Sequence, residues 1–150
     1  MGIEKDIQQN TFRNNYQKAT INLIFTANWL QEKVKNFVEP SEITPQQYNI
    51  LRILRGSKAP LSTLQIRERM LDKMSDTSRL VERLIKKELA TKSVNLIDKR
   101  LVDVTITEKG LALLASLDEK VITLDEQLAC LSTQEIDQLN NLLDKIRQSV

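Results

Sequence analysis

Apolar residues recur at helical spacing over most of this chain. From residue 5 to residue 38 they follow steps of three and four with no proline or glycine between them, which predicts one helix of about 30 residues. Such a helix would extend about 45 Å. Because that length exceeds the core of a single domain of 150 residues, the surplus apolar surface favours packing against a second copy of the chain.

A second helix is predicted to begin at Thr44 and Pro45, with Gln47 completing a capping box, and to end at Gly56. Its buried face is expected to contain Tyr48, Ile50, Leu51 and Leu54.

Two more helices are predicted on either side of a tight break near Asp72. Ser62 or Thr63 is expected to cap the first of them. Its inward side chains are predicted to be Leu64, either Ile66 or the stem of Arg67, and Met70. The second covers residues 74–89 and is strongly amphipathic. Its inward residues are Leu80, Val81, Leu84 and Ile85, and its outward residues are Ser75, Arg79, Glu82, Arg83 and Lys86.

After Leu89 the apolar period changes to the alternation of a strand. Residues 91–94 and 101–106 are predicted to form a hairpin whose exposed tip is 95–100. Thr107 is then expected to cap a leucine-rich helix that runs to Leu131, and Ser132 with Glu135 predicts the cap of a last helix. These helices either close a bundle with the first helix or join a dimer, and the length of the first helix favours the dimer.

Composition excludes most catalytic chemistry. The chain has no histidine, one cysteine and three dispersed glycines, so it cannot build a Ser-His-Asp triad, a His-ligated zinc site, an internal disulfide or a glycine-rich phosphate loop. We therefore expect no enzyme activity, no metal site and no cofactor. Cys130 lies in the apolar run 128–131, which favours a buried structural cysteine over a redox sensor.

The N-terminus is polar and mixed in charge, unlike a signal peptide, and no apolar stretch approaches the roughly 20 residues of a membrane helix. The expected location is the cytoplasm, which fits one unpaired cysteine.

Charge is unevenly distributed along the chain. Residues 52–100 contain 13 Lys/Arg and 6 Asp/Glu, a local charge of +7, whereas the remaining residues carry −5. A central basic block in a nearly neutral chain is typical of a nucleic-acid surface, although a solvated helix face is the alternative.

Two short helices with a tight break, followed by a basic-tipped hairpin, predict a winged helix-turn-helix. The fold class is mainly α with a small β-hairpin wing. The N-terminal part of the second short helix would face base edges in the major groove, its later cations would meet phosphates, and the hairpin tip would reach the minor groove. The candidate DNA-binding residues are Thr63, Ser75, Asp76, Ser78, Arg79, Arg83, Lys86, Asp98, Lys99 and Arg100.

Two acidic residues in this set need an explanation beside DNA. Asp76 either selects a cytosine amino group or caps the helix, and the cap is favoured. Asp98 fits if it pairs with Arg100 and orients the guanidinium.

Three motifs carry a resemblance to a known family. The run S-R-L-V-E-R-L-I-K-K (78–87), the wing sequence Asp98-Lys99-Arg100 and the junction V-T-I-T-E-K-G (104–110) follow in order at the separations found in the multiple antibiotic resistance regulator (MarR) family, which this chain resembles. The chain departs from the pattern at Glu88, where relatives usually have a glycine; a non-glycine residue takes a left-handed cap less cheaply, so this corner is expected to be built differently.

The resemblance implies a homodimer that binds a pseudo-palindromic operator in double-stranded DNA, often released by a small anionic or aromatic effector or by oxidation. Residues 1–150 would form a single MarR-like domain, with a winged helix-turn-helix lobe at 44–107 and dimerisation helices at 1–40 and 108–150. An effector pocket between the lobe and these helices would draw on Tyr16, Phe25, Trp29 and Tyr48, although such aromatics are more often core residues. The alternative function is a winged-helix protein-interaction module without specific DNA binding.

Overall fold

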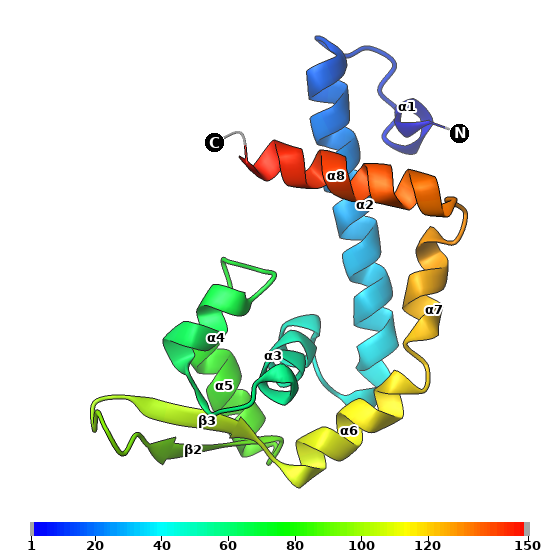
Figure 1. Cartoon of the computed structure of the whole chain (residues 1–150). Coiled ribbons are helices and arrows are strands. Elements are labelled where there is room, and N and C mark those ends of the chain that lie inside the picture. Colours follow the sequence, from blue (N-terminus) through cyan, green and yellow to red (C-terminus); the bar gives the residue numbers. More distant parts are fainter. Residues whose placement is uncertain (1, 149–150) are drawn as a thin grey trace.

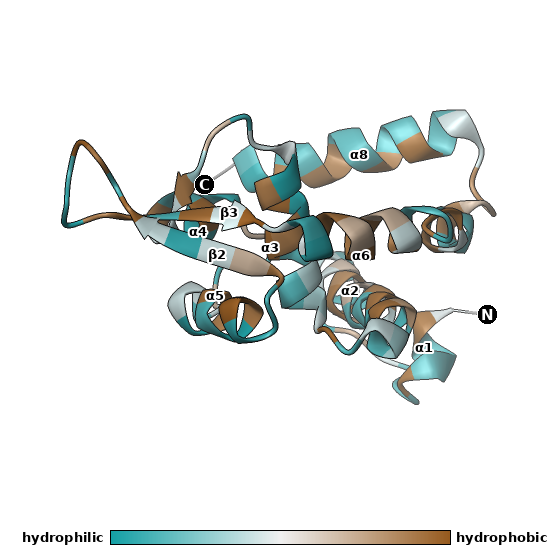
Figure 2. Cartoon of the chain, turned by 90° about the horizontal axis from the view of Figure 1, so that it is seen from below, coloured by the Kyte–Doolittle hydropathy of each residue, from teal (hydrophilic) through white to brown (hydrophobic). Residues whose placement is uncertain are grey.

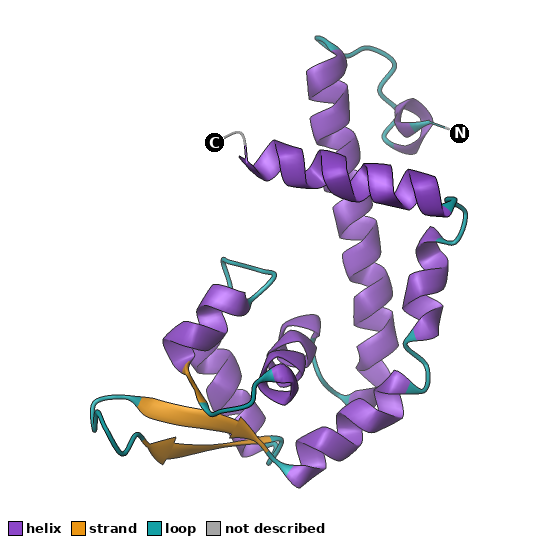
Figure 3. Ribbon diagram, viewed as in Figure 1, coloured by secondary structure: helices purple, strands orange, loops and turns teal. Residues whose placement is uncertain are grey.

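A computed structural model of the chain describes residues 2–148 as a mainly helical protein with one small sheet (Figure 1; Figure 3). Its N-terminal elements are α1 (Ile3–Asp6), α2 (Asn15–Val38) and the 3-10 turn η1 (Glu39–Ser41). The others, in chain order, are α3 (Pro45–Gly56), β1 (Leu61–Ser62), α4 (Thr63–Arg69), α5 (Thr77–Lys86), β2 (Ala90–Val94), β3 (Val102–Ile106), α6 (Glu108–Asp118), α7 (Ile122–Asp125), η2 (Glu126–Leu128) and α8 (Thr133–Gln148). The predicted fold class, helices with a β-hairpin wing, is confirmed.

The first predicted helix is wrong at its N-terminal end. Instead of one helix from residue 5, the chain forms the single turn α1 and starts again at α2, which has 24 residues. Gln8 has a φ of 53°, in the left-handed region, and the side chain of Asn14 accepts a hydrogen bond from the backbone N–H of Gln17 at 2.9 Å. Polar side chains that bond nearby backbone groups favour such breaks over helix continuation, even where the apolar period is intact.

The helix α3 packs one face into the hydrophobic core, and both its cap and its buried face agree with the sequence prediction. Thr44 and Gln47 form the expected capping box, with Thr44 N–H to Gln47 Oε1 at 3.0 Å and Gln47 N–H to Thr44 Oγ1 at 3.2 Å. Its inward residues Tyr48, Ile50, Leu51 and Leu54 are all buried. Gly56 is the last helical residue and keeps a negative φ, so the helix ends without a left-handed glycine.

The helix α4 places only part of its predicted face inside. Ser62 caps it, and Ile66 and Met70 are buried, but Leu64 is 61% exposed. The prediction for Leu64 is wrong because Leu64 and Ile66 are two residues apart, and such residues lie on different sides of a helix.

The wing hairpin forms within one residue of the predicted bounds. β2 and β3 pair antiparallel from Ala90↔Ile106 to Val94↔Val102. The short strand β1 adds to the other edge of β3, giving the order β1-β3-β2, with Leu61 opposite the fully buried Val104. Sequence alternation did not predict β1, since two residues contain no period.

The long C-terminal helix predicted from Thr107 to Leu131 is also wrong. Thr107 caps α6 as expected, accepting from the backbone N–H of Gly110 at 3.1 Å, but α6 ends at Asp118. Beyond it the chain makes tight turns, such as Lys120 N–H to Leu117 O at 3.0 Å, before α7 and η2. After these turns α7 lies against α2, and such a tertiary contact outweighs the local preference for one continuous helix.

The last helix, α8, begins at the predicted cap. Ser132 N–H donates to Glu135 Oε2 at 2.8 Å, and Glu135 N–H donates to Ser132 Oγ at 3.3 Å. Figure 2 shows α8 standing apart from α2, and none of its described residues is buried within the protomer. No helix within residues 2–148 is both long and apolar enough to cross a membrane.

Candidate nucleic-acid interface

The helix α5 is positioned by its cap and by its apolar face. The side chain of Asp76 accepts a hydrogen bond from the backbone N–H of Arg79 at 3.1 Å, so the predicted cap is present. Val81 and Leu84 are buried against the core, which fixes the rotation of the helix. Asp76 and Ser75 lie just before the helix rather than in its first turn, because the helix begins at Thr77, three residues later than residue 74.

That rotation leaves one polar face of α5 in solvent. The exposed residues of this face are Ser78, Arg79, Glu82, Arg83 and Lys86. Arg79 and Arg83 border a shallow hollow with Gln46 of α3. The structure thus brings the predicted α5 cations to a single accessible surface.

The connection between α4 and α5 is held by local hydrogen bonds. Asn49 Oδ1 accepts from the backbone N–H of Leu71 at 2.9 Å, which ties the connection to α3. Asp72 Oδ1 accepts from the backbone N–H of Met74 at 3.0 Å. This N–H holds the pKa of Asp72 below its ordinary value. The charged carboxylate therefore fixes the turn that positions Asp76.

A second hollow opens where the N-termini of α4 and α5 meet. Thr63, Arg67, Ser75, Asp76 and Ser78 border it, together with Leu64 and Thr77. Thr77 is 4% exposed, and its hydroxyl has no hydrogen-bond partner within residues 2–148. Backbone N–H groups at a helix N-terminus attract anions. Thr63 was predicted from the sequence, whereas Thr77 and Arg67 were not; the position of Thr77 directly after the cap was the available signal.

The wing carries the remaining predicted residues. Arg100 is 93% exposed on its side chain, and its Nε lies 3.4 Å from Asp98 Oδ1. The same carboxylate oxygen accepts the backbone N–H of Arg100 at 3.0 Å. Asp98 therefore pairs with Arg100 as expected, and Lys99 beside them is exposed. Figure 1 shows the β2–β3 hairpin projecting beyond α4 and α5.

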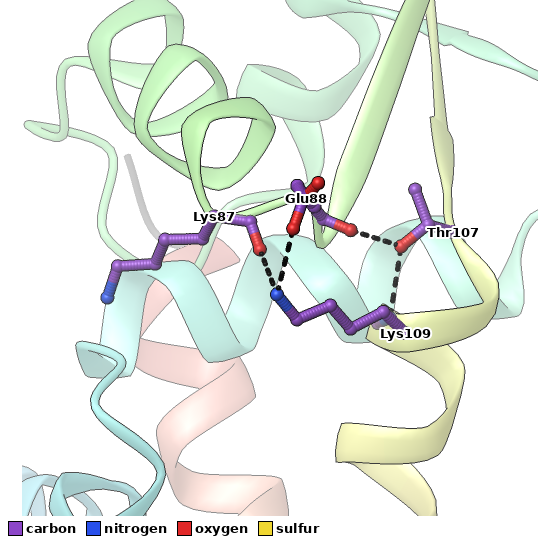
Figure 4. Close-up of polar contacts among 5 residues, drawn as sticks. Lys87, Glu88, Thr107 and Lys109 are labelled. Atoms are coloured by element: carbon purple, nitrogen blue, oxygen red, sulfur yellow. Dashed lines mark hydrogen bonds and ion pairs between the residues drawn. The ribbon is translucent and has the colours of Figure 1, made fainter.

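A compact set of contacts joins the end of α5 to the start of α6 (Figure 4). Lys109 Nζ donates to Lys87 O at 3.0 Å and lies 3.3 Å from Glu88 Oε2, while Thr107 Oγ1 donates to Glu88 O at 2.7 Å. Glu88 has a φ of 61°, in the left-handed region where glycine is favoured. The expectation that this corner would be built differently without glycine is wrong: Glu88 adopts the left-handed conformation, and neighbouring hydrogen bonds stabilise it.

The four aromatic residues predicted for an effector pocket do not come together. Tyr48 is buried in the core, its ring 6.0 Å from the ring of Phe37 in an edge-to-face contact. Tyr16 is 85% exposed at the far end of α2, and Phe25 and Trp29 are partly exposed between them. None of the four borders the hollows found in the described chain.

A larger hollow does lie between α2 and the start of α3. It is bordered by Glu32, Glu39 and Glu42 and by Lys35, among others. This hollow was not predicted, because its residues come from the polar side of α2 and from the turn around Pro40, where no apolar pattern marks a site.

The prediction that Cys130 is a buried structural cysteine is wrong for the protomer. Cys130 is exposed in the protomer, in the turn between η2 and Ser132, because the leucine stripe around it breaks into short turns and does not pack as one helix. Among residues 2–148, no group of three His, Cys, Asp or Glu side chains could hold a metal ion.

Comparison with known proteins gives a consistent picture. No family model matches the chain. The HTH-type transcriptional regulator MhqR of Bacillus subtilis is 24% identical over 120 residues, covering 78% of this chain and 81% of MhqR. A cysteine-to-serine mutant of MarR from E. coli, solved in complex with operator DNA, is 25% identical with a TM-score of 0.75, covering 83% of this chain and 91% of that one.

A further solved structure carries a ligand. PcaV, a transcriptional regulator from Streptomyces coelicolor in complex with its natural ligand, is 23% identical with a TM-score of 0.70, covering 82% of this chain and 89% of that one. The resemblance to the MarR family, expected from three sequence motifs, is confirmed by these similarities.

Proposed function

We propose that this chain, which has the MarR-family fold, is a homodimeric, sequence-specific DNA-binding transcription regulator. The single observation that carries the proposal is the exposed α5 face with Arg79, Arg83 and Lys86, placed beside a wing that projects Arg100 into solvent. The similarity to the E. coli MarR mutant solved in complex with operator DNA supports the same proposal.

Each group of residues has a role in this proposal. Ser78 and Arg79 face base edges in the major groove, where Arg79 can donate two hydrogen bonds to a guanine. The Ser75 hydroxyl, predicted to join them, is buried and does not reach this face. Arg83 and Lys86 meet phosphates, as does Thr63 beside the α5 N-terminus. Arg100, oriented by Asp98 and accompanied by Lys99, enters the flanking minor groove.

The dimer is proposed from apolar surface that the protomer leaves in solvent. On α2, Leu23, Ile24, Phe25 and Trp29 are between 37% and 57% exposed, and on α8 Leu142 is 52% exposed. Residues 1–40 and 108–150 would therefore pair with a second copy, leaving lobe 44–107 free for DNA. The two 52–100 segments of the dimer would together present about +14 to one duplex.

An effector would act between the lobe and the dimerisation helices. The acidic hollow bordered by Glu32, Glu39 and Glu42 lies at that boundary in the protomer. A small molecule that binds one arrangement of the two lobes better than the other would release the DNA.

The test uses a duplex selected by the protein from random sequences. Arg79→Ala should relax base preference, and Arg100→Ala should weaken binding by roughly 1–3 kcal/mol. The matched control is Arg13→Ala, an exposed arginine outside the lobe, which should bind as the unmodified chain does. Unchanged binding by both lobe variants would contradict the proposal and favour a protein-interaction module.

A further inference from the structure

The tip of the wing presents two apolar side chains almost completely to solvent. Leu96 is 96% exposed and Ile97 is 97% exposed. Val94 and Leu101, at the ends of the two strands, are 59% and 46% exposed. Figure 2 shows hydrophobic colour, alternating with hydrophilic colour, in the loop at the hairpin tip. A contiguous exposed apolar patch of this kind marks a contact site more often than a lone exposed leucine does.

The tip is held in shape by hydrogen bonds. Asn95 Oδ1 accepts the backbone N–H groups of Ile97 at 2.9 Å and Asp98 at 2.8 Å. Asn95 Nδ2 donates to both carboxylate oxygens of Asp103, at 3.0 and 3.2 Å. The backbone N–H of Asn95 donates to Leu101 O at 3.0 Å. The two apolar side chains are thus presented by a braced turn, which lowers the entropy lost when they are buried in a partner.

The charges beside the tip indicate which partner fits. Lys99 and Arg100 follow closely after Ile97, and the only carboxylate of the tip segment 95–100, Asp98, is paired with Arg100. An apolar point flanked by cations complements a polyanion whose narrow groove has apolar sugar walls and stacked base faces. Proteins that enter the minor groove often combine cations with apolar wedges, which unstack a base step and kink the duplex.

We propose that Leu96 and Ile97 form an apolar wedge that enters the minor groove beside Arg100 and partly unstacks one base step flanking the recognition site. This proposal rests on the DNA-binding function proposed above. It adds a contact that depends on the deformability of the flanking step, so flexible pyrimidine–purine steps would be preferred there.

The experiment uses the duplex selected from random sequences by the unmodified chain, with 2-aminopurine replacing each flanking adenine in turn. Fluorescence of this base analogue rises when stacking is lost. The double variant Leu96→Ser/Ile97→Ser is compared with Leu71→Ser, which removes a leucine that is 87% exposed outside the wing. Thermal unfolding of each variant checks that the fold is kept.

Binding of the unmodified chain should raise the fluorescence at one flanking step. The double variant should abolish that rise and bind about tenfold more weakly, whereas Leu71→Ser should keep both signals. If the unmodified chain binds its duplex but does not change the 2-aminopurine fluorescence at any flanking position, the wedge is overturned and the DNA-binding function stands. If the double variant binds equally well, the wedge is also overturned.

Two further outcomes would redirect the assignment. A change in sedimentation of the free protein on the double substitution would show that the tip contacts a second copy, and would overturn the wedge. Failure of the unmodified chain to enrich any duplex would overturn the DNA-binding function itself, together with the wedge that depends on it.

Discussion

Arg55 at the end of α3 and Asp118 at the end of α6 form a bidentate ion pair, with Nη2 of Arg55 3.1 Å from Oδ1 of Asp118 and Nη1 2.5 Å from Oδ2. The pair joins the lobe that carries α5 and the wing to the helices proposed to form the dimer. Hydrogen bonding from Arg55 holds the pKa of Asp118 below its ordinary value.

The first prediction concerns this pair. Asp118→Asn should lower the free energy of unfolding at pH 7 by about 0.5 kcal/mol, because a partly exposed pair is screened by solvent. A carboxyl whose folded pKa is depressed contributes stability above its unfolded pKa of about 3.9 and loses it as pH falls through the folded pKa. Urea unfolding should therefore show a larger difference at pH 7 than at pH 3, because the stabilisation begins to be lost below the unfolded pKa. Glu119→Gln, which removes the neighbouring carboxylate, is the control, and an equal loss there would argue against a specific pair.

The second prediction concerns the left-handed corner at Glu88. Glu88→Gly should be more stable than Glu88→Ala by about 1 kcal/mol, since only glycine adopts a positive φ without steric cost. Both variants lose the Lys109 contact equally, so their difference isolates the backbone conformation. Denaturant unfolding measures both. Greater stability of the alanine variant would mean that Glu88 does not hold this conformation.

The third prediction compares two glycines. A Cβ added at Gly110 would lie 2.3 Å from Leu89 O and 2.7 Å from Ile106 Cγ1, so Gly110→Ala should destabilise the protein by about 2 kcal/mol or more. A Cβ at Gly56 meets nothing within 4 Å. Gly56→Ala should therefore stabilise by about 0.5 kcal/mol, through higher helix propensity. Melting temperatures of the two variants on either side of the unmodified chain would agree with the packing described; a neutral Gly110→Ala would contradict it.

The fourth prediction separates two roles of Asp76. Asp76→Ala should cost about 1 kcal/mol of stability, because the N–H of Arg79 loses its acceptor, and Asp76→Asn should cost little. If capping is the whole role, the Asn variant should also select the same DNA sequence as the unmodified chain. A changed base at one position would instead assign Asp76 to cytosine recognition.

Local signals in the sequence predicted the parts of the fold that depend on neighbours along the chain. The capping box of Thr44 and Gln47, the cap at Ser132 and the turn that pairs Asp98 with Arg100 all involve residues within three positions of one another. Such contacts depend only on side chains that are close in sequence, and the structure contains all three.

Features that depend on distant parts of the chain were not predictable in this way. The strand β1 forms because Leu61 pairs with Val104 of β3. The left-handed conformation of Glu88 is stabilised by hydrogen bonds from Thr107 to Glu88 O and from Lys109 to Lys87 O. The breaks before Asn15 and after Asp118 interrupt apolar patterns that continue through them, so periodicity alone predicted helices that were too long. Several apolar residues of the N- and C-terminal helices remain exposed in the protomer, and Trp29 and Cys130 are among the exposed side chains.

Selection of bound duplexes from a random pool by the unmodified protein tests sequence-specific DNA binding most directly. The proposed dimer, with one α5 from each protomer in successive major grooves, predicts an enriched inverted repeat whose half-sites lie about one helical turn apart. Binding to that repeat should weaken steeply between 50 and 200 mM salt, by roughly a factor of 10³ or more for six or more phosphate contacts. Absence of any enriched sequence, or binding that does not respond to salt, would contradict the account.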